Sequence, residues 1–362
     1  MSKSTRPNGP VAAAPVERAE ERNFRPSALT DFVGQAKVKK TLAMMLRASQ
    51  KRGQALEHVV FFGPPGLGKT TLAAIVAAEM GAQLHEVSAP ALFKTGDLAA
   101  VLSIVQAKDV LFLDEVHRLR AEIAELLYGA MENFRLSIVL DRGDPPITLP
   151  LPMFTLIGAT TDYGLLPGPL RARFGHSFAL SLYTEDELRD VVLRAGLLAG
   201  IAVEEDAARE IARRSRGTPR VALRLFRRTL DLATDRDCDR LDAAIVRDAM
   251  SLLGVDALGL EDADRRYLHT LAQTYNSGPV GPKSLAASSG LDLATIEQVI
   301  EPWLLQAGLI ARTRYGRALT PLGHVHLGGN GHASGEAFEL IDEDDFELVE
   351  GDEVIELDEE GG

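Results

Sequence analysis

The stretch Val59-Val-Phe-Phe-Gly-Pro-Pro-Gly-Leu-Gly-Lys-Thr70 decides the fold of this 362-residue chain. Its four leading apolar residues predict a short buried strand, and the part from Gly63 to Thr70 fits the pattern G-x-x-x-x-G-K-[ST]. An alanine-rich segment closed by Gly81 follows and predicts a helix. Glycines let backbone N–H groups turn inward around phosphates at the positive end of such a helix. We therefore expect a phosphate-binding loop, with ATP as the nucleotide.

Each polar position of this loop has an expected task. Lys69 can reach the β- and γ-phosphates, and the Thr70 hydroxyl suits Mg²⁺. Gly66, Gly68 and Thr71 are expected to contact the nucleotide as well.

A second apolar run, Leu111-Phe-Leu-Asp-Glu115, ends in two carboxylates. Parallel strands end at one edge of a sheet, so these acids would lie beside the loop. Asp114 would hold the metal directly or through water, and Glu115 would polarise the attacking water. Acids that end a strand are often only solvated turn residues, and the neighbouring phosphate loop favours the catalytic interpretation.

A third apolar run, Phe154-Thr-Leu-Ile-Gly158, leads to Thr160-Thr161. A hydroxyl or amide there, with Thr161 as the candidate, could position water or sense the γ-phosphate. A threonine that only caps the strand end explains the pattern equally well.

Two arginines have informative neighbours. In Gly217-Thr-Pro-Arg220, the glycine can end one helix, the threonine can cap the next and the proline suits its first turn, which places Arg220 where it can swing over the γ-phosphate. Leu170-Arg-Ala-Arg-Phe174 places Arg173 just beyond the third strand. At a subunit edge Arg173 would act on a neighbour's ATP and make an oligomer obligatory. Solvated surface arginines are the alternative for both.

The order of the patterns predicts the domain organisation. Apolar runs alternating with helical patterns over residues 25–182 predict parallel strands with crossover helices, a three-layer α/β sandwich. Residues 183–255 read as a small, wholly helical lid domain. Three helical stretches and a strand–turn–strand segment over residues 256–330 predict a winged helix. Residues 1–24 read as a flexible leader and residues 331–362 as an acidic, disordered tail.

Charge and composition limit the partners and the compartment. Residues 331–362 carry 14 Asp and Glu and no Lys or Arg, so the net charge of −13 becomes +1 when this tail is left out. The body is therefore compatible with nucleic acid, and the tail is a solubilising or a regulatory extension. The single cysteine, Cys238, excludes an internal disulfide, and no secretory signal or membrane-spanning run is evident, so we expect a cytoplasmic protein.

Taken together, these motifs resemble the AAA+ ATPases and, in detail, the RuvB family of Holliday-junction branch-migration motors. The resemblance spans about Arg25 to Leu327. Its general pieces are Asp31-Phe-Val-Gly-Gln35, the phosphate loop, Phe112-Leu-Asp-Glu-Val-His-Arg118 and Gly158-Ala-Thr-Thr161. Its family-specific pieces, inside the winged helix, are Gly278-Pro-Val-Gly281 and Glu301-Pro-Trp-Leu-Leu-Gln-Ala-Gly308.

The resemblance implies an ATP-driven ring, usually a hexamer, that encircles duplex DNA and pumps it through a Holliday junction with RuvA, and with RuvC in a resolvase assembly. It implies that Arg173 is a finger acting in trans and Arg220 a second sensor. The further residues that it implies near the nucleotide are Phe24, Arg25, Tyr183, Glu132, Asn133 and Phe134.

In the wing, Arg312 and Arg317 resemble the family's phosphate contacts. Three arginines between positions 312 and 317 suit sequence-independent grip on the DNA backbone, although a merely solvated wing has a similar composition. The wing departs from the family at Arg314 and Tyr315.

The segment from Leu136 to Leu149 alternates around a polar turn and predicts a hairpin before the third strand. In the family this hairpin docks on RuvA, so Ile147 and Leu149 are the expected partner contacts; packing against the same subunit is the alternative. Asp141 and Asp144 stand at the tip, where small and basic residues are usual.

Two other classes combine AAA+ domains with further modules. A replication-initiator-like nucleotide switch would read bases through a recognition helix, yet the predicted helix from Leu293 to Ala307 contains no Lys or Arg. A clamp-loader-like remodeller would need a collar in place of the wing.

Overall fold

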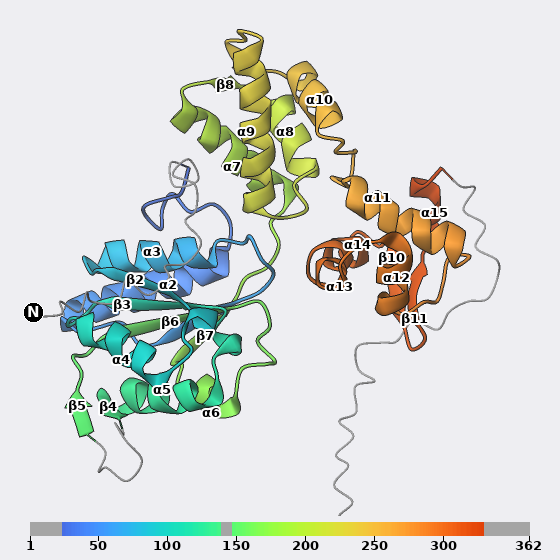
Figure 1. Ribbon diagram of the computed structural model, residues 1–362. Helices are drawn as coiled ribbons and strands as arrows, with labels where there is room; N and C mark the ends of the chain where they lie inside the picture. Colours follow the sequence, from blue (N-terminus) through green and yellow to red (C-terminus); the bar gives the residue numbers. More distant parts are fainter. Residues whose placement is uncertain (1–23, 139–146, 329–362) are drawn as a thin grey trace, which may run out of the picture. The chain divides into compact units, whose positions relative to one another are not determined.

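A computed structural model describes residues 24–138 and 147–328, which belong to two compact units. The first unit runs to Leu253, with residues 257–259, and contains an α/β domain and a helical lid (Figure 1). The second comprises residues 254–256 and the chain from Leu260 onward. The predicted leader up to residue 23, Asp141 and Asp144 at the hairpin tip, and the acidic tail all lie outside the described residues.

The α/β domain is built on a five-stranded sheet with the order β2-β3-β6-β1-β7, and every neighbouring pair is parallel. The strands are β1 (Val59–Phe62), β2 (Leu84–Ser88), β3 (Val110–Asp114), β6 (Thr155–Thr160) and β7 (His176–Ala179). Parallel neighbours that are not consecutive in the chain require crossover connections. The predicted three-layer α/β sandwich is confirmed.

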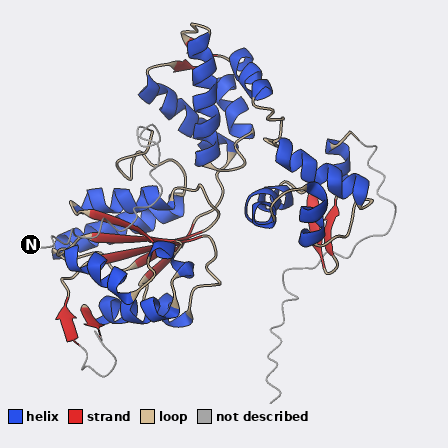
Figure 2. Ribbon diagram, viewed as in Figure 1, coloured by secondary structure: helices blue, strands red, loops and turns tan. Residues whose placement is uncertain are grey.

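Helices cover both faces of this sheet (Figures 1 and 2). Figure 1 shows α2 (Ala36–Arg52) and α3 (Lys69–Met80) on one face, and α4 (Thr95–Ile104), α5 (Ala121–Asn133) and α6 (Gly168–Arg171) on the other. Short 3-10 turns, η1 (Ala89–Ala91) and η2 (Val116–Arg118), follow β2 and β3. Because both faces are covered, every residue of β6 is buried.

Strand β1 lies in the interior of the sheet, between β6 and β7. Its register pairs Phe62 with Thr160 of β6, and β3 ends in Asp114 on the other side of β6. The phosphate loop after Phe62, the end of β6 and the acidic end of β3 therefore lie along the same edge of the sheet.

The predicted hairpin is present as the antiparallel pair β4 (Arg135–Ile138) and β5 (Ile147–Pro150). Leu136 and Leu149 pair across it, yet Leu136 is buried in the core of the α/β domain whereas Leu149 is 45% exposed. Leu149, toward the base of the hairpin, is therefore not packed into the core of the α/β domain. The side chain of Ile147 lies outside the described part of the chain.

The lid consists of α7 (Glu185–Ala199), α8 (Glu205–Arg213), α9 (Pro219–Asp235) and α10 (Ala243–Leu252). The Thr218 hydroxyl accepts the N–H of Val221 and caps α9, with Pro219 in its first turn, as predicted. The prediction of a wholly helical domain was wrong in one detail: β8 (Ala202–Val203) and β9 (Arg240–Leu241) form a parallel pair, too short to leave a two-residue alternation in the sequence.

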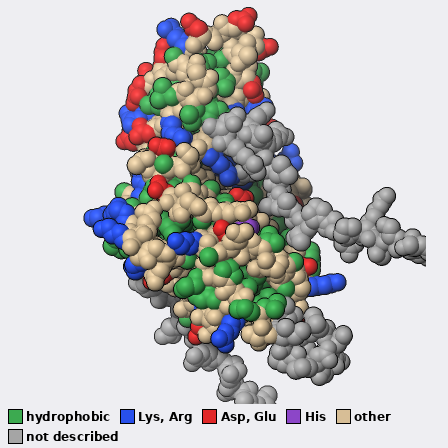
Figure 3. All heavy atoms as spheres, turned by 90° about the vertical axis from the view of Figure 1, so that its left-hand side faces the viewer, with side chains coloured by type: hydrophobic (Ala, Val, Ile, Leu, Met, Phe, Trp, Pro, Cys, Tyr) green, Lys and Arg blue, Asp and Glu red, His purple; other side chains and the backbone are tan. Residues whose placement is uncertain are grey.

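The lid surface, at the top of Figure 3, intersperses acidic and basic side chains. Arg189, for example, forms ion pairs with Asp186, Asp190 and Glu205. Exposed pairs of this kind contribute little stability individually. No helix in the described ranges has both the length and the apolar character that crossing a bilayer demands.

The second unit is the predicted winged helix, which is confirmed. Its helical elements are α11 (Asp262–His269), η3 (Thr270–Thr274), α12 (Pro282–Ser289), α13 (Leu293–Thr295), η4 (Ile296–Ile300), α14 (Glu301–Gln306) and α15 (Pro321–His326). The wing consists of β10 (Ile310–Thr313) and β11 (Gly316–Leu319), an antiparallel pair. Segments η3 and η4 are π-helical, a widening of the helix that residue periodicity did not predict.

Candidate functional site

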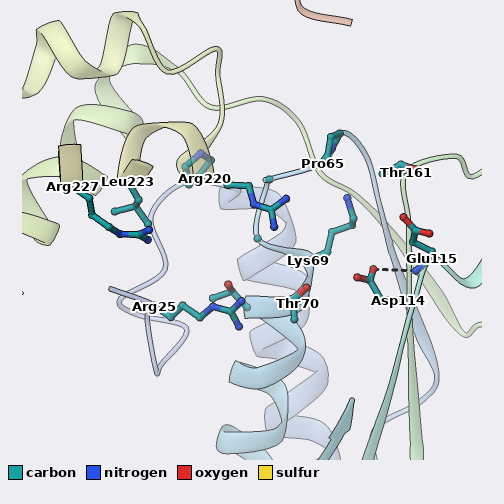
Figure 4. A pocket seen from close by; sticks show the side chains of 14 residues that line it. Arg25, Pro65, Lys69, Thr70, Asp114, Glu115, Thr161, Arg220, Leu223 and Arg227 are labelled. Carbon is teal, nitrogen blue, oxygen red and sulfur yellow. Dashed lines mark hydrogen bonds between the residues drawn. The ribbon is translucent and has the colours of Figure 1, made fainter. Parts of the chain in front are cut away.

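A pocket of about 250 Å³ opens where the phosphate loop meets the lid helix α9 (Figure 4). Ten of the predicted nucleotide-site residues line it: Arg25, Gly66, Gly68, Lys69, Thr70, Thr71, Asp114, Glu115, Thr161 and Arg220. Pro65, Pro219, Leu223 and Arg227 line it too and were missed. Spacing along α9 could have found the last two, because Leu223 and Arg227 lie three and seven residues beyond Arg220 and so share its helix face.

The loop backbone depends on its glycines. Gly66 and Gly68 adopt φ values of +82° and +96°, which side-chain-bearing residues rarely adopt. A Cβ atom at Gly66 would lie 3.1 Å from the Cβ atom of Arg220. Glycine at position 66 thus lets the lid helix approach the loop closely.

Lys69 begins α3 and is 8% exposed. Its Nζ atom donates hydrogen bonds to the carbonyl oxygens of Gly63 and Pro64, at 2.7 and 2.9 Å. Burial lowers the pKa of this ammonium from its usual 10.5 to about 8. A buried cation that lies in a loop of inward-facing backbone suits the phosphates of a nucleotide.

Asp114 ends β3 and Glu115 follows directly, both opposite Lys69 (Figure 4). The N–H of Glu115 donates to Oδ1 of Asp114 at 3.0 Å, and burial raises the pKa of the Asp114 carboxyl above its ordinary value. Glu115 itself has a left-handed φ of +51°, and its Oε2 accepts a hydrogen bond from Arg118 at 2.9 Å. The two acids therefore have different surroundings, as different tasks would require.

The two threonines at the end of β6, Thr160 within the strand and Thr161 just after it, also differ in their surroundings. Thr160 is buried, and its hydroxyl is within 2.8 Å of Nδ1 of His117 and accepts the N–H of Asp162. Thr161 instead lines the pocket. Of the two, Thr161 can meet a bound nucleotide, while Thr160 connects the end of β6 to the turn after Glu115.

The lid contacts the carbonyl groups of the phosphate loop directly. The N–H of Arg220 donates to the oxygen of Gly66 at 3.4 Å, and the Tyr183 hydroxyl donates to the oxygen of Leu67 at 3.4 Å. Tyr183 is buried, which raises the pKa of its hydroxyl, and it also donates its N–H to Gly217. Tyr183 does not itself line the pocket but connects the loop to the lid.

The start of the described chain closes another side of the pocket. Phe24 packs edge-on against Phe226 of α9, with ring centroids 5.7 Å apart, and the Arg227 guanidinium lies 5.7 Å from the Phe24 ring. Arg25 lines the pocket, and burial lowers the pKa of its guanidinium, partly offset by Glu86. Phe24 therefore does not line the pocket itself but packs against α9, which carries lining residues.

Arg173 lies elsewhere, after α6. Its Nη1 donates to the carbonyl of Pro169 at 2.7 Å, its Nη2 donates to Glu132 at 3.1 Å, and its guanidinium covers the Tyr128 ring at 4.8 Å. None of Arg173, Glu132, Asn133 and Phe134 is among the described residues that line the chain's own pocket. Phe134 instead packs against the rings of His58 and Phe154.

The two wing arginines have unequal surroundings. The Arg312 side chain is 58% exposed, whereas that of Arg317 is 19% exposed and forms an ion pair of 2.9 Å with the buried Glu301. The sequence placed both in one class of phosphate contact. The structure shows Arg317 engaged inside its own unit and Arg312 open to solvent.

The strand–loop–helix with its buried lysine, the acidic pair at the end of β3, and a lid arginine against the loop define an AAA+ ATPase. Three family models together match nearly all of the described chain: the Holliday junction DNA helicase RuvB P-loop domain over residues 24–180, the RuvB AAA lid domain over 183–256 and the RuvB C-terminal winged helix domain over 257–328. The chain belongs to the RuvB family.

Individual relatives agree with the family models. The chain is 47% identical over 310 residues to the Holliday junction branch migration complex subunit RuvB of Fervidobacterium nodosum, covering 85% of this chain and 89% of the relative. Identity to the protein of the same name from Latilactobacillus sakei is 48% over 314 residues, covering 86% and 94%. A solved structure of the Thermotoga maritima RuvB Holliday junction branch migration motor matches with a TM-score of 0.77 and 46% identity, covering 85% and 99%.

Proposed function

We propose that this chain is an ATP-driven DNA motor that moves the branch point of Holliday junctions during homologous recombination and DNA repair. The observation that carries the proposal is the pocket in which the phosphate loop, the acids of β3 and Arg220 of the lid meet. We assign ATP hydrolysis to residues 25–182, the moving lid to residues 183–255 and DNA binding to residues 256–330.

The polar residues of the phosphate loop and of the two strand ends have separate tasks in hydrolysis. Lys69 binds the β- and γ-phosphates, and Glu115 accepts a hydrogen bond from the attacking water and orients it toward the γ-phosphorus. Thr161, which follows β6 and lines the same pocket, positions this water or senses the γ-phosphate. Mg²⁺ neutralises phosphate charge when bound, and hydroxyl and carboxylate oxygens of Thr70 and Asp114, which line the same pocket, are the ligand type it prefers.

Mg²⁺ at a nucleotide site does not need a cage of protein ligands. In the described ranges there is no cluster of three or more His, Cys, Asp or Glu side chains suited to a metal ion. Mg²⁺ in nucleotide sites is held by one or two protein oxygens together with phosphate oxygens and waters, so a closed protein cage is not required.

Motion follows from the contacts between the lid and the loop. Arg220 and Tyr183 donate hydrogen bonds to carbonyl oxygens of Gly66 and Leu67, so a change in the loop on hydrolysis acts directly on α9 and on the chain entering the lid. The lid angle then changes with the nucleotide. A ring of subunits converts this change into movement of duplex DNA.

The ring also completes the catalytic site. Arg173 lies outside its own pocket, so its expected role is to stabilise the charge that develops on a neighbour's γ-phosphate. Glu132, Asn133 and Phe134 would lie on the same subunit edge and reach the neighbour's nucleotide. A hexamer is the assembly that the family resemblance implies.

The remaining partners are inferred from the family. The winged helix binds duplex DNA through phosphate contacts, the hairpin with its exposed Leu149 is the docking site for RuvA, and RuvC joins in a resolvase assembly. A cytoplasmic location fits these partners.

The decisive experiment measures ATP hydrolysis and strand separation on a synthetic four-way junction, with and without RuvA. We expect RuvA to stimulate both activities in the wild-type chain and not in Glu115→Gln. Hydrolysis without any junction movement would contradict the motor.

The initiator-like alternative is not favoured. The relatives described above carry the name of a branch migration complex subunit. In the winged helix, the segment from α13 to α14 contains no Lys or Arg with which to read bases.

A further inference from the structure

The carboxylate of Glu301 lies buried beneath the wing of the winged-helix unit. Its side chain has no exposed surface, which is unusual for glutamate unless it is paired. The hydroxyl of Tyr267 donates to Oε1 at 3.1 Å, and the Arg317 guanidinium donates through Nε and Nη2 at 3.0 and 2.9 Å. A two-pronged guanidinium–carboxylate pair fixes direction as well as distance.

The backbone of Arg317 is fixed as firmly as its side chain. Val280 donates its N–H to the carbonyl of Arg317 at 2.9 Å and accepts the N–H of Arg317 at 2.8 Å. A Cβ atom at Gly278 would lie 2.4 Å from the Arg317 oxygen, and one at Gly316 would lie 2.4 Å from the Val280 oxygen. The base of the wing therefore holds Arg317 in one place.

Arg312 lies directly opposite Arg317 in the β10–β11 ladder. Like charges at such a position destabilise a strand pair. Oε2 of Glu301 lies 2.9 Å from Nη2 of Arg317 and 3.6 Å from Nη2 of Arg312, so one buried negative charge serves both cations. The outer part of Arg312 remains open to solvent.

We propose that Glu301 is the positioning residue of the wing: it holds Arg317 as a fixed support and orients Arg312 as the group that contacts a DNA phosphate. The inference rests on the proposed function, because it requires the wing to bind duplex DNA. Arg317 and Arg312, which look equivalent in the sequence, then have different roles.

The positioning role and net charge alone predict opposite changes in the DNA affinity of the variant Glu301→Gln. Glu301→Gln removes a negative charge from the DNA-binding unit. Counterion release then predicts tighter DNA binding and a steeper salt dependence. Loss of positioning predicts weaker binding, because the two arginines repel each other and Arg312 is no longer directed.

The test titrates a labelled duplex of mixed sequence with the full-length chain at several salt concentrations. We expect Glu301→Gln to weaken binding roughly three- to ten-fold, and Arg312→Gln to reduce the salt slope by about one per engaged subunit. Tyr267→Phe retains the charge of Glu301 but removes one hydrogen bond to it, so it should weaken binding by a smaller factor. Glu297→Gln, an exposed acid of the same unit, is the charge-matched control and should bind at least as tightly as wild type.

The variants distinguish a failure of the positioning role of Glu301 from a failure of DNA binding by the wing. Fluorescence of Trp303, in the same helix as Glu301, reports whether each variant is folded. If Arg312→Gln weakens binding but Glu301→Gln binds as tightly as Glu297→Gln, the positioning role is overturned and the proposed function stands. If Glu301→Gln is unfolded, Tyr267→Phe decides instead: a duplex affinity equal to that of wild type overturns the positioning role of Glu301. If wild type does not bind duplex, or Arg312→Gln changes nothing, the DNA-binding function of the wing fails instead.

Discussion

The Lys69 ammonium is a buried charge whose energetic cost can be measured without nucleotide. Its pKa falls from the usual 10.5 to about 8 because burial disfavours the charged form. One pH unit corresponds to about 1.4 kcal/mol, so the native state disfavours the protonated amine by about 3 kcal/mol at neutral pH. Lys69→Met retains the apolar stem of the side chain and removes this charge.

The substitution also removes the two hydrogen bonds to the carbonyls of Gly63 and Pro64. Each is worth about 1 kcal/mol. We therefore expect Lys69→Met to raise the free energy of unfolding of the nucleotide-free chain by about 1 kcal/mol at pH 7. The residue that binds ATP is thus expected to destabilise the protein in the absence of ATP.

The pH dependence gives the sign of the effect independently. Because the folded pKa is lowered, between pH 8 and 10.5 the unfolded chain binds the proton at Lys69 and the native chain does not. Wild-type stability therefore rises with pH in this range relative to the variant. The penalty is complete below pH 8 and is lost toward pH 10.5, so the advantage of Lys69→Met should shrink above pH 8 and then reverse.

The assay is denaturant unfolding with a chelator present, from pH 7 to 10, with and without an ATP analogue. At a free analogue concentration of about 100 times its dissociation constant, wild type should gain about 2.7 kcal/mol and the variant nothing. Lys51→Met, which removes an exposed ammonium in the same unit, should stay within about 0.5 kcal/mol of wild type. The reasoning would be refuted if Lys69→Met were less stable than wild type at pH 7. It would also be refuted if the difference in their free energies of unfolding did not change with pH.

Three further predictions follow from the site. Glu115→Gln should bind ATP with unchanged affinity and lose turnover, because only the residue that orients water is altered; equilibrium binding beside steady-state hydrolysis checks this, and normal turnover would exclude the role. Arg173→Ala should lower hydrolysis about 10³-fold or more, and mixing with Lys69→Met subunits that retain Arg173 should restore part of the activity; a mixture with no regained hydrolysis would argue against a shared site. Gly63→Ala should lower the free energy of unfolding by about 2 kcal/mol or more, because φ is +137° and the new Cβ atom would lie 2.4 Å from the Leu180 oxygen; an unchanged thermal melt would contradict it.

The sequence predicted the elements whose pattern is local. Strand β1 was predicted at its observed bounds, since four apolar residues end at a glycine-rich loop. Strand β7, from His176 to Ala179, was not predicted, because an edge strand with only one buried residue carries no apolar run. What places β7 in the sheet is its pairing with β1, more than a hundred residues earlier.

In the candidate sites, too, local motifs were predictable and contacts between distant segments were not. Ten nucleotide-site residues share one pocket because they belong to motifs with fixed spacing around the loop and the lid helix. The different surroundings of Arg312 and Arg317 could not be predicted, because the decisive partner, Glu301, lies on a helix packed beneath the wing. Nothing in the local sequence states that this acid is buried.

The interior position of β1 has a consequence for the synthesis of the chain. Val59 pairs with Ile157 on one side and with His176 on the other, so the strand that carries the phosphate loop has no sheet partner until about a hundred further residues have left the ribosome. At about 5–20 residues per second this interval is roughly 5–20 seconds. The four apolar residues of β1 are therefore unpaired in the nascent polypeptide during this interval, and rare codons between residues 62 and 157 would lengthen it.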